Sequence, residues 1–175
     1  MTVELAGIRP GQSVLDVGCG TGSLTLAARA AVGASGQVSG IDPSPEMIDV
    51  ARKKATKARS AVDFREGVIE AIPFPDASFD VVLSSLMLHH LPHDLKRKGF
   101  EEIARVLKPG GVFLAVDMAG GSHGLLGHLL GGRAGHKQPN GLSALPPMLT
   151  AAGFQDAKAG PTKVRMLGFL SGRRP

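Results

Sequence analysis

The chain has 175 residues, of which 24 are Gly and 12 are Pro, and it carries a net charge of +5 with neither Trp nor Tyr. This length favours one domain over residues 1–175, and a single Cys excludes an internal disulfide or a cysteine-rich zinc site. No apolar stretch approaches the ~20 residues of a membrane span, and the first residues lack a signal-peptide pattern, so we expect a cytoplasmic protein.

Short apolar runs rich in β-branched residues alternate with helical patterns along the chain. Five runs are expected to be buried strands: residues 14–17, 38–41, 62–64, 79–83 and 112–116. A terminal pair of strands is predicted at 154–159 and 164–172, with its turn at Gly160-Pro161. Because parallel neighbours need crossover connections, this alternation predicts an α/β fold with a doubly wound sheet.

The first clear helix signal is Ser44-Pro45-Glu46, which supplies an N-cap, a Pro at the first helical position and an acid in the first turn. The residues expected on its buried face are Met47, Ala51 and Ala55. The opposite face is basic, and we interpret it as a solvated surface. Its residues are Arg52, Lys53, Lys54, Lys57 and Arg59.

A second amphipathic pattern predicts a helix that ends at residues 108–111, with His93 as its cap. The residues expected on its apolar face are Leu95, Gly99, Ile103 and Leu107. Residues 143–152 favour a further helix. Residues 119–141 hold eight glycines and little pattern, which is typical of a functional or flexible excursion.

A glycine-rich turn follows the first predicted strand in the sequence VLDVGCGTG, residues 14–22. Gly18, Gly20 and Gly22 allow a sharp turn and a close approach of the backbone to a ligand. Asp42 ends the second strand, where an acid can accept hydrogen bonds from ribose hydroxyls. Both features fall at carboxyl ends of parallel strands, so the sequence predicts a site for a ribose-bearing ligand there.

The identity of that ligand depends on Asp16, two residues before the first glycine of the turn. A carboxylate at this position would oppose a pyrophosphate, but it suits a ligand with an ammonium and a sulfonium. The G-x-G-x-G spacing also differs from the G-x-G-x-x-G pattern of dinucleotide sites. Both observations favour S-adenosylmethionine over NAD.

At these residues the sequence resembles the class I S-adenosylmethionine-dependent methyltransferases, and in particular the small-molecule group that includes the ubiquinone/menaquinone methyltransferases. The matching motifs, from about Pro10 onward, are VLDVGCGTG, GIDPSPEM, IPFPDASFDVV, SSLMLHHL and ARVLKPGG. The resemblance implies a Rossmann-like, seven-stranded sheet of order 3-2-1-4-5-7-6 with strand 7 antiparallel. It also implies S-adenosylmethionine as cofactor and S-adenosylhomocysteine as product.

The resemblance further implies which residues bind the cofactor: the glycine-rich turn beside the methionine moiety, an acid on the ribose, and a later segment beside the adenine. These residues are Asp16, Gly18, Cys19, Gly20, Thr21, Gly22, Asp42, Pro43, Met47, Gly67, Val68, Ile69 and Ser84. Cys19 is interpreted as a small side chain in the turn, not as a nucleophile.

The chain departs from the family at two places. Relatives commonly have an Asp at the position of Val68, and losing its contact with the adenine predicts affinity lower by roughly one to two decades. Relatives also carry helices before the first strand that close over the site, whereas here that strand begins near Ser13. We therefore expect a fold without the usual N-terminal lid helices, in which residues 119–141 replace the lid or the site is open.

His89 and His90 follow the fourth predicted strand and are the candidate general bases, since an imidazole suits proton removal near neutral pH. The alternative is that one packs at a helix start and the other lines the cleft. No metal is predicted, because the remaining histidines of the glycine-rich segment match no ligand spacing. These are His123, His128 and His136.

The sequence thus predicts an enzyme that moves a methyl group from S-adenosylmethionine to O, N or C of a small molecule by in-line displacement. One alternative is a nucleic-acid methyltransferase, which the charge of +5 favours and the absence of Tyr and Trp disfavours. Another is a non-catalytic S-adenosylmethionine-binding accessory protein, suggested by the missing lid and Val68. The expected partner is a small-molecule substrate, and a homodimer is compatible with the sequence.

Overall fold

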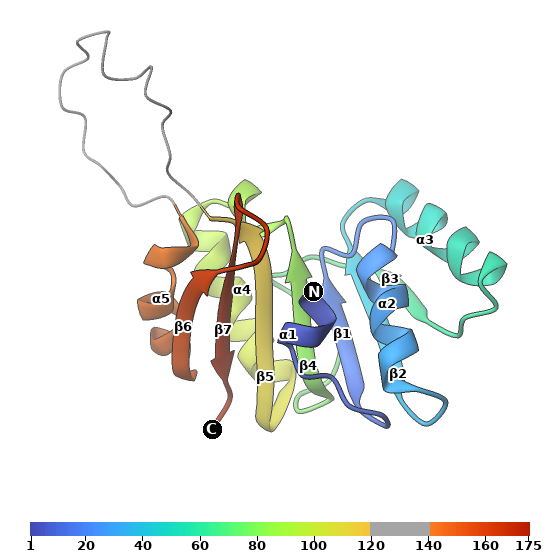
Figure 1. Ribbon diagram of the computed structural model, residues 1–175, viewed down its shortest axis with the longest axis horizontal. Helices are drawn as coiled ribbons and strands as arrows, with labels where there is room; N and C mark the ends of the chain where they lie inside the picture. Colours follow the sequence, from blue (N-terminus) through green and yellow to red (C-terminus); the bar gives the residue numbers. More distant parts are fainter. Residues whose placement is uncertain (120–140) are drawn as a thin grey trace, which may run out of the picture.

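The computed structural model describes residues 1–119 and 141–175, in which seven strands form one sheet with helices on both faces (Figure 1). The strands are β1 (Ser13–Val17), β2 (Gln37–Asp42), β3 (Asp63–Glu66), β4 (Phe79–Ser85), β5 (Leu107–Met118), β6 (Gln155–Pro161) and β7 (Leu167–Arg173). The helices are α1 (Thr2–Leu5), α2 (Ser23–Val32), α3 (Pro45–Lys57), α4 (His93–Val106) and α5 (Pro146–Ala151), with 3-10 turns η1 (Leu88–His90) and η3 (Leu142–Ala144).

The strand order is β3-β2-β1-β4-β5-β7-β6, which confirms the predicted sheet. Strand β1 lies parallel to both β2 and β4, and β7 runs antiparallel to both its neighbours. The sheet therefore extends from β1 to both sides, with β2 and β3 on one side and β4 and β5 on the other. Strands β1, β2, β4 and β5 all end at one edge of the sheet (Figure 1). That edge is where open α/β sheets bind ligands.

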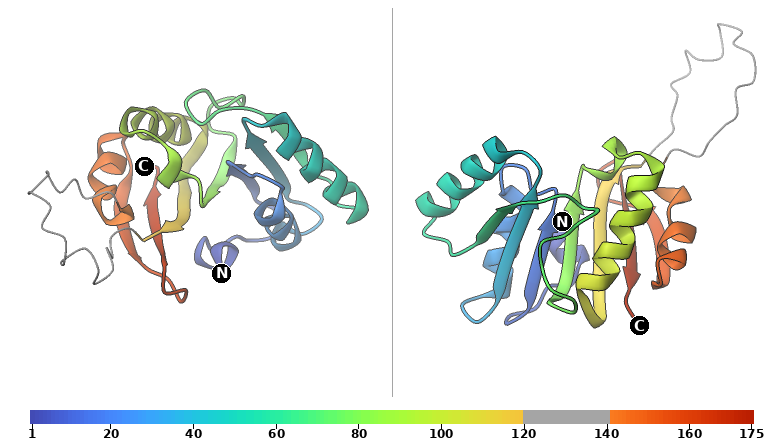
Figure 2. Two further views of the ribbon diagram at one scale, coloured as in Figure 1. Left: turned by 90° about the horizontal axis from the view of Figure 1, so that it is seen from above. Right: turned by 180° about the vertical axis from the view of Figure 1, so that it is seen from behind.

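Two apolar layers hold the helices on the sheet. On one face, Ala6, which follows α1, and Ala28 and Val32 of α2 pack on Val14 and Val38. On the other face, α4 packs on the central strands and α5 on β6 and β7, and Figure 2 shows α4 opposite α1 and α2 in the view from above. Because both faces of β1, β4 and β5 are covered, these strands read as almost continuously apolar runs.

The helix α3 begins as its sequence predicts, since Ser44 Oγ accepts a hydrogen bond from the Met47 amide at 3.2 Å and Pro45 is the first helical residue. The predicted buried face is wrong at one position. Met47 is 42% exposed, and Ile48 is buried with Ala51 and Ala55. The spacing of 48, 51 and 55 follows the 3.6-residue helical period more closely than a strict four-residue repeat does.

The helix α4 ends at Val106, earlier than its sequence predicts, and residues 108–111 belong to β5. The cause is non-local: the Gly110 amide donates to the Arg174 carbonyl, and the Arg174 amide donates to the Gly111 carbonyl. These bonds extend the sheet, so Leu107 is buried in β5 and not on the helix. The buried residues of α4 are Gly99, Phe100, Ile103 and Val106, whereas Leu95 is only half-buried.

The start of α4 also differs from its prediction. His93 is the first helical residue, the N-cap is Pro92, and no side chain caps the helix. Gly99 does not interrupt α4, although glycine weakens isolated helices. A Cβ at Gly99 would lie 2.6 Å from the Ile69 side chain. The absence of a side chain at Gly99 therefore lets α4 approach the segment that follows β3.

The predicted terminal strand pair is present, but its turn spans residues 162–166. Gly160 and Pro161 belong to β6, where they pair with Phe169 and Gly168. Because β6 is an edge strand, a Pro there sacrifices no ladder hydrogen bond. The Thr162 hydroxyl lies within hydrogen-bonding distance of the Leu167 carbonyl, at 2.9 Å, which fixes the turn. The predicted excursion at 119–141 lies, except for its two end residues, outside the described residues.

Candidate functional site

The glycine-rich turn links β1 to α2 at the ligand-binding edge of the sheet. Gly20 and Gly22 have φ of 51° and 77°, in the left-handed region that favours glycine. A Cβ at Gly22 would lie 2.8 Å from Phe64, so this glycine lets the turn pack on β3. A Cβ at Gly20 would meet no atom within 4 Å, so the turn presents open backbone at this point.

Asp42 stands at the end of β2 and holds this turn in place. Its Oδ2 accepts a hydrogen bond from the Gly20 amide at 2.8 Å, and its Oδ1 accepts one from the Ser44 amide at 3.0 Å. The side chain is half-buried, so it also keeps a solvent-accessible side. A carboxylate has about four acceptor positions, which leaves capacity for ribose hydroxyls.

Asp16 and Ser84 are buried polar residues with unused hydrogen-bonding capacity. Thr25 Oγ1 donates to Asp16 Oδ2 at 2.6 Å, while Asp16 Oδ1 and Ser84 Oγ have no partner among the described residues. An unsatisfied buried polar group costs about 1–3 kcal/mol, so such groups in native proteins require an explanation. Asp16 lies near the end of β1 and Ser84 near the end of the adjacent strand β4, with their side chains on opposite faces of the sheet. Each is therefore a separate candidate acceptor for a hydrogen-bond donor of a ligand.

Burial raises the pKa of the Asp16 carboxyl to about 7, and the Thr25 hydroxyl partly opposes this effect by stabilising the carboxylate. A cation beside Asp16 would restore the charged form. Burial likewise raises the pKa of the Cys19 thiol to about 12, with a contribution from Asp16 and Asp42. Cys19 therefore stays protonated at neutral pH and is a poor nucleophile.

The segment that follows β3 lies beside Asp42 at the end of β2. The Gly67 amide donates to the Asp42 carbonyl at 3.1 Å, which places the 67–69 segment beside the ribose candidate. Val68 is 38% exposed, and the side chain of Ile69 is buried in the core. Pro43 directly follows β2 and Met47 lies in the first turn of α3, and both residues are exposed.

Sequence reasoning missed a lysine that contacts the turn. Lys54 Nζ lies 2.7 Å from Thr21 Oγ1 and donates a hydrogen bond to it, so α3 is joined to the glycine-rich turn. Lys54 belongs to the basic run that the sequence interprets as a solvated face. Lys54 lies one helical turn beyond Ala51, and Ala51 packs against Gly22. This spacing could have indicated that Lys54 lies near the glycine-rich turn.

The structure separates the two candidate bases. His89 Nδ1 lies 2.5 Å from Asp117 Oδ1, and the His89 amide donates to Asp117 Oδ2 at 3.2 Å. Both residues are exposed, and their rings contact each other with centroids 3.8 Å apart and a tilt of 42° between the ring planes. His89 is thus oriented by a carboxylate, with its Nε2 left for other contacts, whereas His90 has no such partner among the described residues.

Asp117 is the second residue that the sequence did not single out. It is 1% exposed, and besides His89 its Oδ1 accepts a hydrogen bond from the Met118 amide at 2.7 Å. The signal was present: Asp117 directly follows the apolar run 112–116 and therefore falls at the ligand-binding edge. A buried carboxylate that accepts hydrogen bonds from an imidazole fixes its tautomer and orientation.

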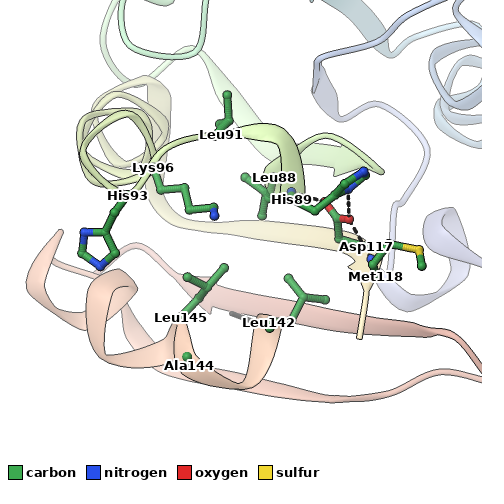
Figure 3. Close-up of a pocket in the computed structure, with 11 residues that line it drawn as sticks. Leu88, His89, Leu91, His93, Lys96, Asp117, Met118, Leu142, Ala144 and Leu145 are labelled. Atoms are coloured by element: carbon green, nitrogen blue, oxygen red, sulfur yellow. Dashed lines mark hydrogen bonds and ion pairs between the residues drawn. The ribbon is translucent and has the colours of Figure 1, made fainter. Parts of the chain in front are cut away.

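A pocket of about 800 Å³ opens beside the His89–Asp117 pair (Figure 3). Its apolar walls come from two segments that are far apart in the chain: the η1 segment supplies Leu88 and Leu91, and the η3 segment supplies Leu142 and Leu145. Two cationic or ionisable side chains of α4, His93 and Lys96, also line it. The pocket therefore combines apolar walls with several polar and ionisable groups, an arrangement that suits a small molecule with both kinds of surface.

The described residues contain neither a cluster of metal ligands nor a helix that could span a membrane. In residues 1–119 and 141–175, no group of three or more His, Cys, Asp or Glu side chains is arranged to hold a metal ion. Within the same ranges, no helix has the length and apolar character needed to cross a membrane. The three histidines of the glycine-rich segment, at 123, 128 and 136, lie outside these ranges.

Comparison with known proteins identifies the family. The sequence profile of the methyltransferase domain family matches residues 14–111, which is more than half of the chain. The chain belongs to this family. The matched region includes the glycine-rich turn, Asp42 and the His89–His90 pair, and the class I methyltransferase prediction is confirmed, together with S-adenosylmethionine as the cofactor of the family.

The chain is similar to methyltransferases of quinone biosynthesis. Demethylmenaquinone methyltransferase of Desulfitobacterium hafniense (strain Y51) is 38% identical over 119 residues, which are 67% of this chain and 46% of that protein. The ubiquinone/menaquinone biosynthesis C-methyltransferase of Hydrogenovibrio crunogenus is 40% identical over 119 residues, again 67% and 46%. This chain thus spans about half the length of the curated relatives that it matches.

A solved structure supports the fold. The crystal structure of a methyltransferase dependent on S-adenosylmethionine from Aquifex aeolicus superimposes with a TM-score of 0.77 and 23% sequence identity. The match covers 98% of this chain and 86% of that one. It shows that the seven-stranded arrangement is the fold of this chain.

Proposed function

We propose that the chain transfers a methyl group from S-adenosylmethionine to a small molecule with an apolar body. The observation that carries this proposal is the His89–Asp117 pair, which opens into an apolar pocket at the same sheet edge as the glycine-rich turn. Membership of the methyltransferase domain family supports it independently. The acceptor accordingly binds between the leucine walls, with its nucleophilic atom toward His89.

The residues present fit the cofactor. The unpartnered Asp16 Oδ1 suits the ammonium of its methionine moiety, and the open backbone at Gly20 allows a close approach. Asp42 accepts from the ribose hydroxyls, with the 67–69 segment and Met47 beside the adenine. When bound, S-adenosylmethionine supplies a methyl group that its sulfonium has already activated for displacement.

His89 acts as general base for acceptors that must lose a proton. Its Nε2 takes the proton from the acceptor hydroxyl, amine or acidic carbon, because Nδ1 is engaged with Asp117. The Asp117 carboxylate stabilises the imidazolium that forms, and the proton then passes to solvent. The leucine walls exclude water from the acceptor and hold it in a reactive orientation.

The relatives narrow the acceptor class. Two of them are named for methylation in menaquinone or ubiquinone biosynthesis, and we include an aromatic or quinol-like acceptor in the proposal on that ground. The oriented base disfavours a purely accessory role, and the absence of Tyr and Trp disfavours nucleic acid as acceptor. A homodimer and a cytoplasmic location stay predictions.

The direct test is methyl transfer by the purified chain. We expect it to bind S-adenosylhomocysteine in titration calorimetry and to produce it from S-adenosylmethionine when given naphthols, catechols or hydroquinones. NAD serves as the control ligand and should not bind. Tight NAD binding without binding of either sulfur ligand would contradict the cofactor assignment. Cofactor binding without turnover across the acceptors would favour the accessory alternative.

Asp42→Ala is expected to weaken S-adenosylhomocysteine binding by about 10- to 100-fold, since it removes both the ribose acceptor and the anchor of the Gly20 amide. Calorimetric titration of both proteins measures the change. Asp49→Ala is the matched control, because Asp49 is an exposed acid on α3 that pairs with Arg52. Unchanged affinity in Asp42→Ala would show that the ribose assignment is wrong.

A further inference from the structure

The acceptor pocket contains a charged side chain for which the proposed reaction has no use. Lys96 lies near the start of α4, and Figure 3 shows its side chain extending into the pocket beside the leucine walls. The residue is half-buried. A half-buried lysine whose side chain lies along apolar walls inside a pocket calls for an explanation in terms of what binds there.

The Lys96 ammonium has no ion-pair or hydrogen-bond partner among the residues that the structure describes. The arginines of the same helix differ in this respect, because Arg97 pairs with Glu101 and Arg105 pairs with Glu102. The carboxylate of the pocket, Asp117, is already engaged by His89 and by the Met118 amide. The pocket thus carries one uncompensated permanent positive charge on its described lining, next to its leucine walls.

We propose that Lys96 selects acceptors that carry an anionic group, a carboxylate or a phosphate, on an apolar skeleton. The inference rests on the proposed function, because it takes this pocket as the acceptor site. In this binding mode the leucine walls contact the apolar skeleton of the acceptor. Lys96 pairs with its anionic group, and its nucleophilic atom lies toward His89. Lys96 is then a specificity-determining residue that makes no contact with the methyl group or with the proton that is removed.

The expected size of the effect follows from the environment of the lysine. Charge-assisted hydrogen bonds are the stronger ones in proteins, but a half-exposed pair is partly screened by solvent. We therefore expect an acceptor acid to bind about tenfold more tightly than its neutral amide. Charge, and not hydrogen-bonding geometry, should decide the preference, because a lysine ammonium acts on an anion as a point charge.

The test compares the binding of hydroxynaphthoate and of hydroxynaphthamide, which have the same skeleton and differ in charge. Calorimetry is carried out on the wild-type protein and on Lys96→Met, Lys96→Arg and Lys98→Met. Lys98→Met is the matched control, since it removes the same charge from an exposed position of α4. Naphthyl phosphate in a parallel titration shows whether a phosphate replaces the carboxylate.

We expect the acid to be preferred about tenfold by the wild type, Lys96→Arg and Lys98→Met, and the preference to vanish in Lys96→Met through weaker binding of the acid alone. Normal S-adenosylhomocysteine binding by Lys96→Met shows that the variant is folded. Equal affinity of the wild type for acid and amide overturns the inference, and so does a preference that survives in Lys96→Met.

The two proposals fail separately, because the titrations need no turnover. An anion preference that depends on Lys96, found in a protein that methylates no acceptor, supports the anion subsite and overturns the proposed reaction. Methylation of neutral acceptors with a KM that Lys96→Met leaves unchanged, and without any preference for acids, overturns the anion subsite and supports the reaction.

Discussion

His89→Gln is expected to lower the rate of methyl transfer by about 10²- to 10⁴-fold while leaving S-adenosylhomocysteine affinity unchanged. Glutamine keeps an N–H that can donate to Asp117, so the buried carboxylate retains a partner and the local fold persists. What is lost is the imidazole that accepts the acceptor's proton. Single-turnover measurements with saturating acceptor report the chemical step without the complication of product release.

The two candidate bases are distinguished by the parallel substitution His90→Gln. Unlike His89, His90 lacks a carboxylate partner among the described residues, so this variant is expected to retain most of the activity. The activity of Asp117→Asn should fall between those of His89→Gln and His90→Gln, because an amide still holds the His89 ring but stabilises its protonated form less well. Equal losses in His89→Gln and His90→Gln, or full activity in His89→Gln, would contradict the assignment.

The fold was predictable because its signals are local. The run into VLDVGCGTG identifies a buried strand, a glycine-rich turn and a helix start within a few residues, and Ser44-Pro45-Glu46 marks the next helix in the same way. What local patterns missed depends on distant partners. Residues 108–111 read as a helix stop, yet they continue β5 because Arg174, at the far end of the chain, pairs with Gly110 and Gly111.

The same distinction applies to the site. Asp16 and Asp42 were predictable because each is read from its own strand end. The partner of His89 was not singled out, since Asp117 is 28 residues away in the chain and meets it only because β4 and β5 are neighbours. The parity of the strands also matters: Val17 pairs with Ser84, so Asp16 and Ser84 point to opposite faces of the sheet. The sequence predicts that both residues lie at the same edge of the sheet, whereas the face to which each side chain points depends on the register between β1 and β4.

Asp16→Asn is expected to make the protein more stable and to weaken cofactor binding, because the substitution removes a buried negative charge. Burial raises the pKa of the Asp16 carboxyl from 3.8 to about 7. The folded chain therefore binds this proton more tightly than the unfolded chain does, and the free energy of unfolding decreases as pH rises from about 4 to about 7. Above pH 7 the full cost of the buried carboxylate is present, up to about 4 kcal/mol.

An asparagine carries no such cost, so the Tm of Asp16→Asn should exceed that of the wild type by several degrees at pH 8 and by little near pH 4. Its affinity for S-adenosylhomocysteine should fall by about 10²-fold at pH 8, since the amide cannot neutralise the ligand ammonium. Wild-type affinity should also fall as pH drops below 7, because the carboxylate is then protonated, while the affinity of the variant stays flat. Thermal melts and calorimetry across this pH range measure both trends, with the exposed Asp49→Asn as control. If Asp16→Asn binds S-adenosylhomocysteine as tightly as the wild type, or is less stable than the wild type at pH 8, the assignment of the buried Asp16 charge to cofactor binding is wrong.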